Sequence, residues 1–204
     1  MSTFDLHTPD SAPEGSHDVM DAYTARFGFV PNLINIMAES PAATKGYAQT
    51  YNLLAETEFT PAQQQLLFLT VSRANACTYC VAAHSVAGQM AGLDGDVIDA
   101  VRDDRPILDA KLAALSEFAA KVVEKRGHLS RHDVDDFLTA GYSRAQILEV
   151  LLAVATKTIS NYMNHIADTP LDDAFAPAAW TPETKSAWTP EMKSAAKSAS
   201  EAAA

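Results

Sequence analysis

The sequence predicts an all-α fold, and three observations support that prediction. Glycine and proline are sparse, with 8 and 10 among 204 residues. The alternating runs of Val, Ile and Thr that are typical of strands do not occur. Apolar residues recur instead at spacings of three and four, between residues that begin or end helices. We therefore expect a multihelical bundle of seven or eight helices.

In the first half of the chain, the predicted helices begin at capping residues. Ser16 is placed to cap a short helix, after which the stretch FGFVPN breaks the pattern. Ser40 and Thr60 are each followed by proline at the first helical position, and Gln63 adds a capping box to the second start. Gly92 is placed to end the last helix of this half. The expected helices are 17–26, 41–58, 61–76 and 77–91.

The second half carries the same signals. Ser130 with Asp133, and Ser143 with Gln146, are capping pairs at helix starts. Gly127 follows a helix whose apolar residues recur every three or four positions, as a C-terminal glycine does. The expected helices are 94–102, 107–125, 131–139 and 144–166.

These helices make one domain, since 204 residues is an ordinary size for a single domain. We place an N-terminal arm at 1–16, a helical domain at 17–176 and a low-complexity tail at 177–204. The tail holds two consecutive octads, WTPETKSA and WTPEMKSA, which are too few for a solenoid. We expect it to be a mobile or weakly helical tail and favour a disordered appendage; the weaker alternative is that Trp180 and Trp188 dock on a neighbouring surface.

Composition and charge exclude several classes of protein. A formal net charge of −11 repels phosphate backbones and anionic lipids, so we expect no nucleic-acid or membrane partner. The apolar runs fall far short of the roughly 20 residues that span a bilayer. The first residues are polar and acidic, unlike a secretion signal. Two cysteines are too few for a disulfide framework. We expect a cytoplasmic protein whose two cysteines act as a pair.

The stretch that carries chemistry is Cys77-x-x-Cys80-x-x-x-His84. On a helix, Cys80 and His84 lie one turn apart on one face, with Cβ atoms roughly 5–6 Å apart. Cys77 lies three residues before Cys80, close enough for a small disulfide. The start of a helix also favours a thiolate, because unpaired N–H groups and the macrodipole attract negative charge. The arrangement indicates a dithiol–disulfide cycle, in which one thiolate attacks an O–O or S–S bond and the second sulfur resolves the product.

Two other interpretations of the motif are weaker. Buried cysteines often pack as small hydrophobes, but here both lie within one turn, with a histidine one turn later. Cys77, Cys80 and His84 would supply three of zinc's usual four ligands. The remaining candidate histidines lie far along the chain without ligand-like spacing, namely His128, His132 and His165. We therefore expect no metal and no bound cofactor.

The stretch SRANACTYCVAAHS resembles the CxxC core of AhpD-like alkylhydroperoxidases, within the carboxymuconolactone decarboxylase family. A looser resemblance runs from residues 29–32 to residues 161–172. It implies an all-helical fold, a homo-trimer or hexamer, and reduction of a hydroperoxide at the expense of a thiol or lipoyl-type reductant. By position, it implies that Cys80 attacks the peroxide, that Cys77 resolves the sulfenic acid and donates a proton, and that His84 helps to activate the thiols.

The chain departs from that pattern at two positions. The best-known members have a glutamate twelve residues before the first cysteine, where this chain has Gln65, which cannot accept a proton as a carboxylate does. They also have a histidine between the cysteines, where this chain has Tyr79. We therefore expect either a relay through His84, Tyr79 and water, or a weak activity. Gln65 itself either orients a water molecule or has a purely packing or capping role.

The helix start and the histidine nominate different sulfurs as the nucleophile. The helix start favours Cys77, whereas the adjacent base favours Cys80. A dipole contributes only about 0.3–1 kcal/mol at an exposed helix end. That is less than the roughly 1.4 kcal/mol that corresponds to one pKa unit. We therefore predict, in agreement with the resemblance, that Cys80 is the peroxidatic residue and Cys77 the resolving one.

Two functions from different classes follow from these residues. The first is a thiol-dependent hydroperoxide reductase, which the intact set of Cys77, Cys80 and His84 favours. The second is a redox-sensing or scaffold protein with a reversible disulfide and no turnover, which Gln65 favours.

Helices 61–76 and 144–166 are apolar around more of their circumference than one buried stripe of ~100° requires. We expect subunit contacts to cover the remainder, as in a trimer or a dimer of trimers.

Overall fold

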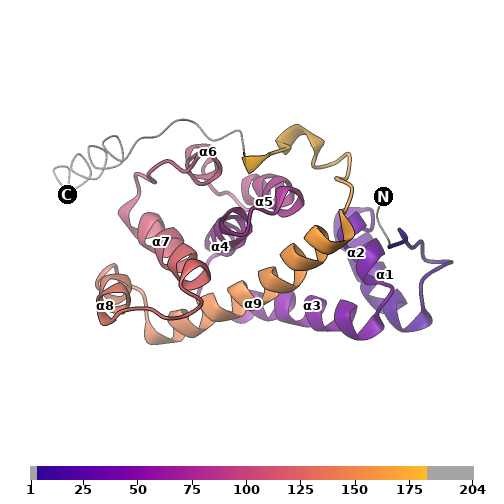
Figure 1. The fold of residues 1–204 in the computed structure, drawn as a ribbon, viewed down its shortest axis with the longest axis horizontal. Helices are drawn as coiled ribbons and strands as arrows, with labels where there is room; N and C mark the ends of the chain where they lie inside the picture. Colours follow the sequence, from indigo (N-terminus) through magenta and orange to yellow (C-terminus); the bar gives the residue numbers. More distant parts are fainter. Residues whose placement is uncertain (1–3, 183–204) are drawn as a thin grey trace.

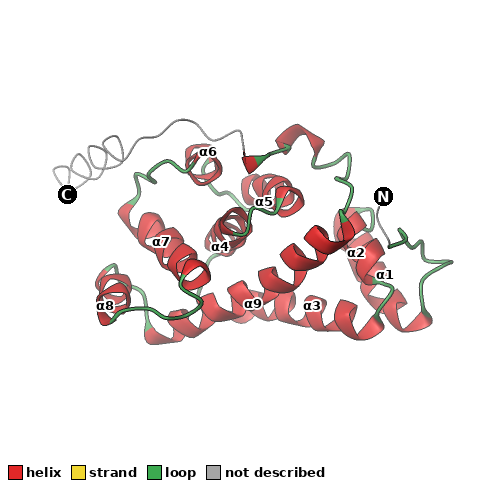
Figure 2. Ribbon diagram, viewed as in Figure 1, coloured by secondary structure: helices red, strands yellow, loops and turns green. Residues whose placement is uncertain are grey.

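The computed structural model describes residues 4–182, and all regular secondary structure in that part of the chain is helical (Figures 1 and 2). The all-α prediction is confirmed. The α-helices are α1 (His17–Phe27), α2 (Asn32–Met37), α3 (Pro41–Leu53), α4 (Pro61–Ala74), α5 (Thr78–Met90), α6 (Gly95–Asp103), α7 (Ala110–Glu124), α8 (Arg131–Thr139) and α9 (Arg144–Ala167). Short 3-10 turns span Glu14–Ser16, Leu54–Glu56 and Ala176–Ala178.

Most helix starts and stops follow the predicted caps. The capping boxes at Thr60, Ser130 and Ser143 are all formed. Gly92 and Gly127 adopt φ values of +80° and +78°, in the left-handed region where glycine is favoured. These local signals correctly place α4, α8 and α9 to within a few residues.

Three predictions about helix ends are wrong. The FGFVPN stretch leads directly into α2, a helix that the sequence pattern did not predict. The backbone N–H of Asn32, the first residue of α2, donates to the carboxylate of Asp172 at 3.1 Å, a partner that lies 140 residues away. The hydroxyl of Ser16 does not cap α1 but donates to the carbonyl of Ala38 at 2.8 Å. The helix predicted over 41–58 ends at Leu53 and continues only as a 3-10 turn.

α4 forms the centre of the bundle, surrounded by α5, α6, α7 and α9 (Figure 1). Leu66, Leu67, Phe68 and Leu69 are at most 1% exposed. The apolar circumference of α4 is therefore covered within one chain, and the expectation that subunit contacts cover part of this helix is wrong.

A second apolar cluster joins the N-terminal helices to the start of α5. Met20 of α1, Ile34 of α2 and Tyr47 of α3 belong to the same buried cluster as Cys77 and Cys80. The N-terminal helices thus cover the two sulfurs and exclude bulk water from them.

The segment after α9 returns along the surface to α6. Trp180 is buried, and its indole Nε1 donates to the carbonyl of Arg102 at 3.1 Å. The guanidinium of Arg102 in turn donates to the carbonyls of Ala178 and Ala179 at 2.9 and 3.2 Å. Trp180 therefore docks on α6 of its own chain, which is the weaker of the two expectations for the tail; Trp188 and most of the octad repeat lie outside the described residues.

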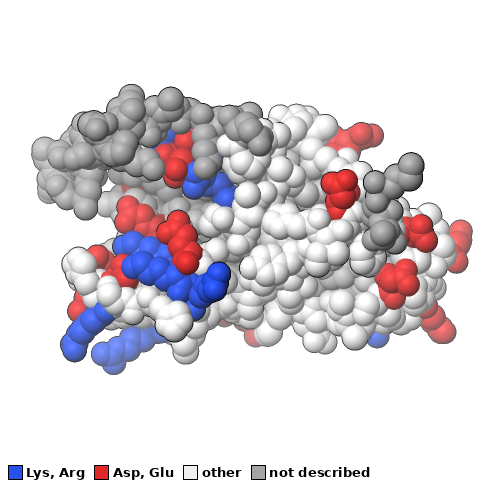
Figure 3. All heavy atoms as spheres, in the orientation of Figure 1, with Lys and Arg blue, Asp and Glu red and all other residues white. Residues whose placement is uncertain are grey.

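Charged side chains are unevenly spread on the face shown in Figure 3. Most of its basic side chains gather in the left half of the view beside acidic ones, and the right half carries mainly acidic side chains. Asp133 shows the pattern, since it pairs with Lys125 at 2.7 Å and Lys121 at 3.1 Å, and these partners hold the pKa of its carboxyl well below the ordinary value.

Among residues 4–182, no single helix is both long and apolar enough to cross a bilayer, whereas α8 and α9 taken together, bent by 111° at their junction, meet that criterion by length and composition.

Candidate active site

The two cysteines lie where the chain turns from α4 into α5. The turn requires Ala76 in the left-handed region (φ 55°), after which Cys77 is the N-cap residue and α5 begins at Thr78, one residue inside the helix expected over 77–91. Cys77 and Cys80 are free thiols, and each is only 1% exposed. The helix start therefore presents a reduced pair inside an apolar shell.

A buried lysine from α9 is the central group of the site. Lys157 is 0% exposed, and its Nζ lies 3.4 Å from Sγ of Cys80 and 2.7 Å from Nε2 of His84. The ring of Phe68 lies beside it, with its centroid 5.6 Å from Nζ. Burying an ammonium is costly unless it is paired and hydrogen-bonded, so these neighbours determine its charge.

Asn164, one further turn along α9 from Ser160, supplies a second donor to the sulfurs. Its Nδ2 lies 3.2 Å from Sγ of Cys80 and 3.8 Å from Sγ of Cys77. The hydroxyl of Ser160 lies 4.0 Å from Sγ of Cys80. Cys80 thus faces a cation and an amide N–H, the groups that stabilise a thiolate.

The hydrogen bonds of His84 define its tautomer. Nδ1 lies 2.9 Å from Oε1 of Gln65, and Nε2 lies next to Nζ of Lys157. An ammonium has no acceptor, so Nε2 accepts from Lys157, and Nδ1 carries the hydrogen and donates to Gln65. Burial, followed by the charge of Lys157, lowers the pKa of His84 well below its ordinary value. The imidazole is therefore neutral.

Lys157, which contacts both the imidazole and the sulfur, is the cation in hydrogen-bond contact with Cys80, and the expectation that His84 acts directly on that thiol stays a prediction. Both ring nitrogens of His84 are engaged, one by Gln65 and the other by Lys157. Gln65, for which water orientation and simple packing were the two expectations, instead accepts the Nδ1 hydrogen and so fixes which nitrogen faces Lys157.

The pKa values of the two thiols are shifted in opposite directions. Burial by itself would raise the pKa of Cys80, but the hydrogen bond from Cys77, the ammonium of Lys157 and the amide of Asn161 together lower the pKa of Cys80 well below its ordinary value. The hydrogen bond with Cys80, followed by burial, raises the pKa of Cys77. The pair therefore holds one proton, on Cys77, and one negative charge, on Cys80.

Tyr79 points to a different part of the molecule. Its hydroxyl donates to Oδ2 of Asp172 at 2.5 Å and accepts from the backbone N–H of Leu33 at 3.3 Å. Burial and then the bond to Asp172 raise the pKa of Tyr79. Tyr79 thus ties α5 to α2 and to the segment after α9, and its hydrogen bonds do not reach His84 or Lys157.

The other histidines considered from the sequence lie away from this site. His128, His132 and His165 are exposed; His132 pairs with Asp136 at 3.4 Å, and His165 stacks on Tyr162. Within residues 4–182, no group of three or more His, Cys, Asp or Glu side chains is arranged to hold a metal ion.

Lys157 is the functional residue that the sequence analysis missed. It lies 77 residues beyond Cys80, so no local motif connects them. One signal was available, since Ala153, Lys157, Asn161 and Asn164 follow one another at spacings of three and four on the buried face of α9. A lysine in that register marks a buried charge that requires a partner.

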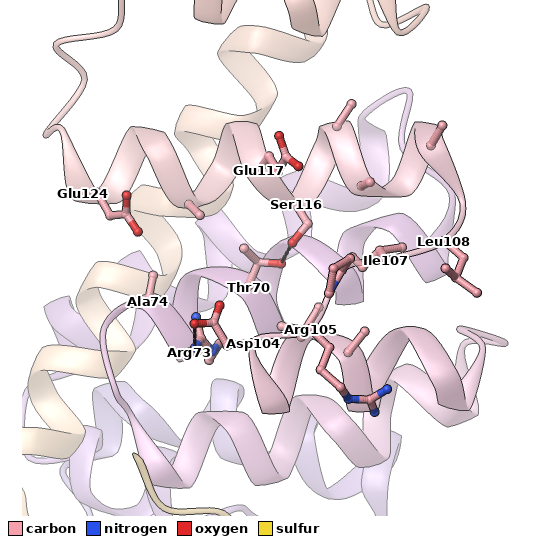
Figure 4. A pocket seen from close by; sticks show the side chains of 17 residues that line it. Thr70, Arg73, Ala74, Asp104, Arg105, Ile107, Leu108, Ser116, Glu117 and Glu124 are labelled. Atoms are coloured by element: carbon pink, nitrogen blue, oxygen red, sulfur yellow. Dashed lines mark hydrogen bonds and ion pairs between the residues drawn. The ribbon is translucent and has the colours of Figure 1, made fainter. Parts of the chain in front are cut away.

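A separate groove of about 550 Å³ lies between α4, α7 and the loop that joins α6 to α7 (Figure 4). Arg73 pairs there with Asp104 at 3.0 Å, and Thr70 shares a hydrogen bond of 2.9 Å with Ser116. Neither Cys80 nor Lys157 lines this groove, so it is distinct from the thiol site.

Residues 41–105 match the sequence model of the carboxymuconolactone decarboxylase family, and this stretch contains Cys77, Cys80 and His84 together with Gln65. This segment belongs to that family. The predicted resemblance is confirmed, and the described residues carry the AhpD-like fold. The chain matches no curated protein sequence.

Several solved structures share the fold. An alkylhydroperoxidase AhpD core protein from Ralstonia eutropha JMP134, described as peroxidase-related, is 21% identical with a TM-score of 0.77, covering 85% of this chain and 94% of that one. A peroxidase-related protein from Silicibacter sp. TM1040 is 19% identical with a TM-score of 0.74, covering 85% and 93%. The debrominase Bmp8 is 16% identical with a TM-score of 0.68, covering 86% and 94%. At these identities the likeness shows a shared fold.

Proposed function

We propose that this protein is a thiol-dependent hydroperoxide reductase that cycles between the Cys77–Cys80 dithiol and a disulfide. The observation that carries the proposal is the environment of Cys80, a buried sulfur with an ammonium at 3.4 Å and an amide N–H at 3.2 Å. These donors favour the thiolate, which is the nucleophilic form of cysteine. The peroxidase-related proteins of the same fold support a hydroperoxide as the substrate class.

The first half-reaction oxidises Cys80. Its thiolate attacks the terminal oxygen of ROOH, the S–O bond forms as the O–O bond breaks, and the products are Cys80 sulfenic acid and the alkoxide RO⁻. One proton converts the alkoxide to the alcohol. The thiol of Cys77 then attacks the sulfenic acid, releasing water and leaving the disulfide.

The second half-reaction restores the pair. A dithiol of the lipoyl type reduces the disulfide by thiol–disulfide exchange, so that the net reaction of ROOH with the dithiol gives ROH, water and the oxidised reductant. Two buried free thiols are suited to a reducing compartment, and we propose the cytoplasm as the location.

The alternative function is a redox-sensing or scaffold protein whose disulfide forms without turnover. Burial favours this alternative, because both cysteines are only 1% exposed and a substrate must reach their sulfurs past α1–α3.

A second alternative is reductive removal of bromine. A dithiol supplies the two electrons that this reaction needs, and the debrominase Bmp8 shares the fold.

One steady-state assay separates these functions. The full-length protein is mixed with cumene hydroperoxide and excess dihydrolipoamide, and peroxide consumption is followed with the wild type, Cys80→Ser and Cys77→Ser. The proposal predicts many turnovers by the wild type and none by either variant. Consumption of one equivalent per subunit, followed by no further reaction, would establish the alternative. A parallel reaction replaces the peroxide with 2,3,4-tribromopyrrole, the ligand of a solved Bmp8 complex, and bromide release there without peroxide consumption in the first reaction would assign the debromination chemistry instead.

We also propose that the protein assembles as a homo-trimer or hexamer through one face of α9. Exposed apolar residues follow that helix at spacings of three, four or eight positions, namely Leu148, Leu151, Ile159, Tyr162 and Ile166, with exposures of 38–71%. A stripe of this length on one helix is typical of an interface. Light scattering at micromolar concentration should give a multiple of 21.9 kDa; a monomer would contradict the proposal.

A further inference from the structure

The charge of Lys157 is balanced by a group that changes during the proposed reaction. Lys157 is fully buried, and within residues 4–182 it makes no ion pair with a carboxylate. Its hydrogen-bond partners are Sγ of Cys80 and Nε2 of His84. With His84 neutral, the anion that compensates the ammonium is the thiolate of Cys80.

The other groups around Lys157 cannot take over that role. From α4, Phe68 and Gln65 are uncharged. From α3, Tyr47 is a fully buried phenol, and burial raises its pKa well above the ordinary value. From α5, Cys77 keeps its proton in the reduced state because its pKa is raised. The buried cluster therefore has zero net charge only when Cys80 is a thiolate and Lys157 an ammonium, or when both charges are absent.

Oxidation of Cys80 removes the negative charge and leaves the ammonium without a counter-ion in an apolar environment, which is unfavourable. The same step releases an alkoxide that needs one proton. We propose that Lys157 is a catalytic residue that gives its proton to this alkoxide and stays a neutral amine until the disulfide is reduced. This inference rests on the proposed function and names the acid that the mechanism requires.

The protons and electrons balance over the cycle. In the oxidising half, the thiolate, the ammonium and ROOH give the sulfenic acid, the amine and ROH. In the reducing half, the disulfide and the amine take up two electrons and two protons, and give the thiol of Cys77, the thiolate of Cys80 and the ammonium of Lys157. The imidazole of His84 keeps its Nδ1 hydrogen on Gln65 throughout, and Nε2 accepts from either form of Lys157.

This proposal also explains what a glutamine, in place of a glutamate, does at position 65. A glutamate in contact with His84 would bring a permanent negative charge close to Lys157 and would let the ammonium persist after Cys80 is oxidised. Gln65 accepts the same hydrogen bond without that charge. The amide therefore keeps the thiolate as the counter-ion of Lys157, and couples the lysine's proton to the redox state of the cysteines.

The test is the pH dependence of the disulfide equilibrium in the full-length wild-type protein. The dithiol–disulfide equilibrium is measured against a reference couple of known pH dependence from pH 6 to pH 8, and thiolate absorbance at 240 nm is recorded on the reduced protein. With Cys80 a thiolate, uptake of two protons changes the equilibrium constant for reduction about 100-fold per pH unit, whereas a lysine that keeps its charge gives about tenfold. A change of about tenfold with the thiolate present would overturn the proposal, and so would the absence of thiolate absorbance.

Two substitutions of Lys157 test whether this side chain stabilises the thiolate and whether it releases the second proton. In Lys157→Arg, the guanidinium keeps its proton. Thiolate absorbance should persist, while the dependence drops to about tenfold per pH unit. In Lys157→Met, thiolate absorbance at pH 7 should disappear. Lys45→Met, on the exposed face of α3, is the control, and its thiolate absorbance and pH dependence should match those of the wild type.

If Lys157→Arg does not fold, the wild-type measurement alone decides. Peroxide turnover with a one-proton equilibrium would reject the role of Lys157 and leave the proposed function intact. A two-proton equilibrium without turnover would reject the function and leave the coupling of Lys157 to the cysteines intact.

Discussion

Asn164→Leu removes the hydrogen bond from the side-chain amide to Cys80 and keeps the branched arrangement of the side-chain heavy atoms. The amide Nδ2 lies 3.2 Å from Sγ of Cys80, while Oδ1 is buried without a partner. Leucine has the same branched skeleton of side-chain heavy atoms as asparagine, and it removes both the donor and the unpartnered oxygen. The free energy of unfolding should therefore not fall by more than about 1 kcal/mol, because an unsatisfied buried group is removed along with the donor.

The effect on the thiolate should be much larger. A hydrogen bond to a charged group contributes about 1.5–3 kcal/mol, and every ~1.4 kcal/mol is tenfold in an equilibrium constant. Loss of this donor raises the pKa of Cys80. At a pH near the wild-type pKa of that thiol or below it, alkylation of Cys80 by iodoacetamide should slow by roughly 10- to 100-fold.

The assay is the rate of alkylation as a function of pH, with the modified cysteine located by tandem mass spectrometry. Well above both pKa values the two proteins should react at similar rates, because the thiolate is then fully formed in each. Asn52→Leu, on the exposed face of α3, is the matched control and should follow the wild-type curve. An Asn164→Leu profile that superimposes on that curve would refute the idea that this amide stabilises the thiolate.

Three further substitutions test the surroundings of the thiols. Burial lowers the folded-state pKa of His84 below its unfolded value, so stability is lost as pH falls below about 6.5. In urea titrations His84→Gln should flatten that loss by up to about 1.4 kcal/mol per pH unit, and an unchanged slope would show that His84 is not the group responsible. Tyr79→Phe removes the bond to Asp172 and should lower the free energy of unfolding by about 1.5–3 kcal/mol while turnover of the folded protein is retained; an altered pH profile of turnover would instead place Tyr79 in a proton relay. Gln65→Leu leaves the Nδ1 hydrogen of His84 without its acceptor and should cost about 1–3 kcal/mol of stability, with the loss of a single tautomer in ¹⁵N spectra of the imidazole; spectra identical to the wild type would contradict the assignment.

The sequence was sufficient for the features that depend on local interactions. Thr60, Ser130 and Ser143 satisfy backbone N–H groups three residues away, so their capping boxes can be recognised without knowing the fold. These interactions are complete within one turn, and tertiary packing did not override them.

The features that the sequence did not reveal depend on long-range contacts. α2 is stabilised at its first turn by Asp172, which belongs to the segment after α9. Lys157 reaches Cys80 only because α9 packs beside α5. The prediction that Cys80 is the more acidic thiol agrees with its lowered pKa, but helical spacing, which places His84 near Cys80, could not reveal that Lys157 contacts both side chains.

The location of the sulfenic acid tests the central claim most directly, since that claim is that Cys80 is the thiolate that attacks the peroxide. The wild type, Cys77→Ser and Cys80→Ser are treated with one equivalent of cumene hydroperoxide in the presence of dimedone, and the adducts are located by mass spectrometry. The account predicts an adduct on Cys80 in Cys77→Ser and no adduct in Cys80→Ser. An adduct on Cys77 in Cys80→Ser, with none in Cys77→Ser, would contradict it and identify Cys77 as the nucleophile.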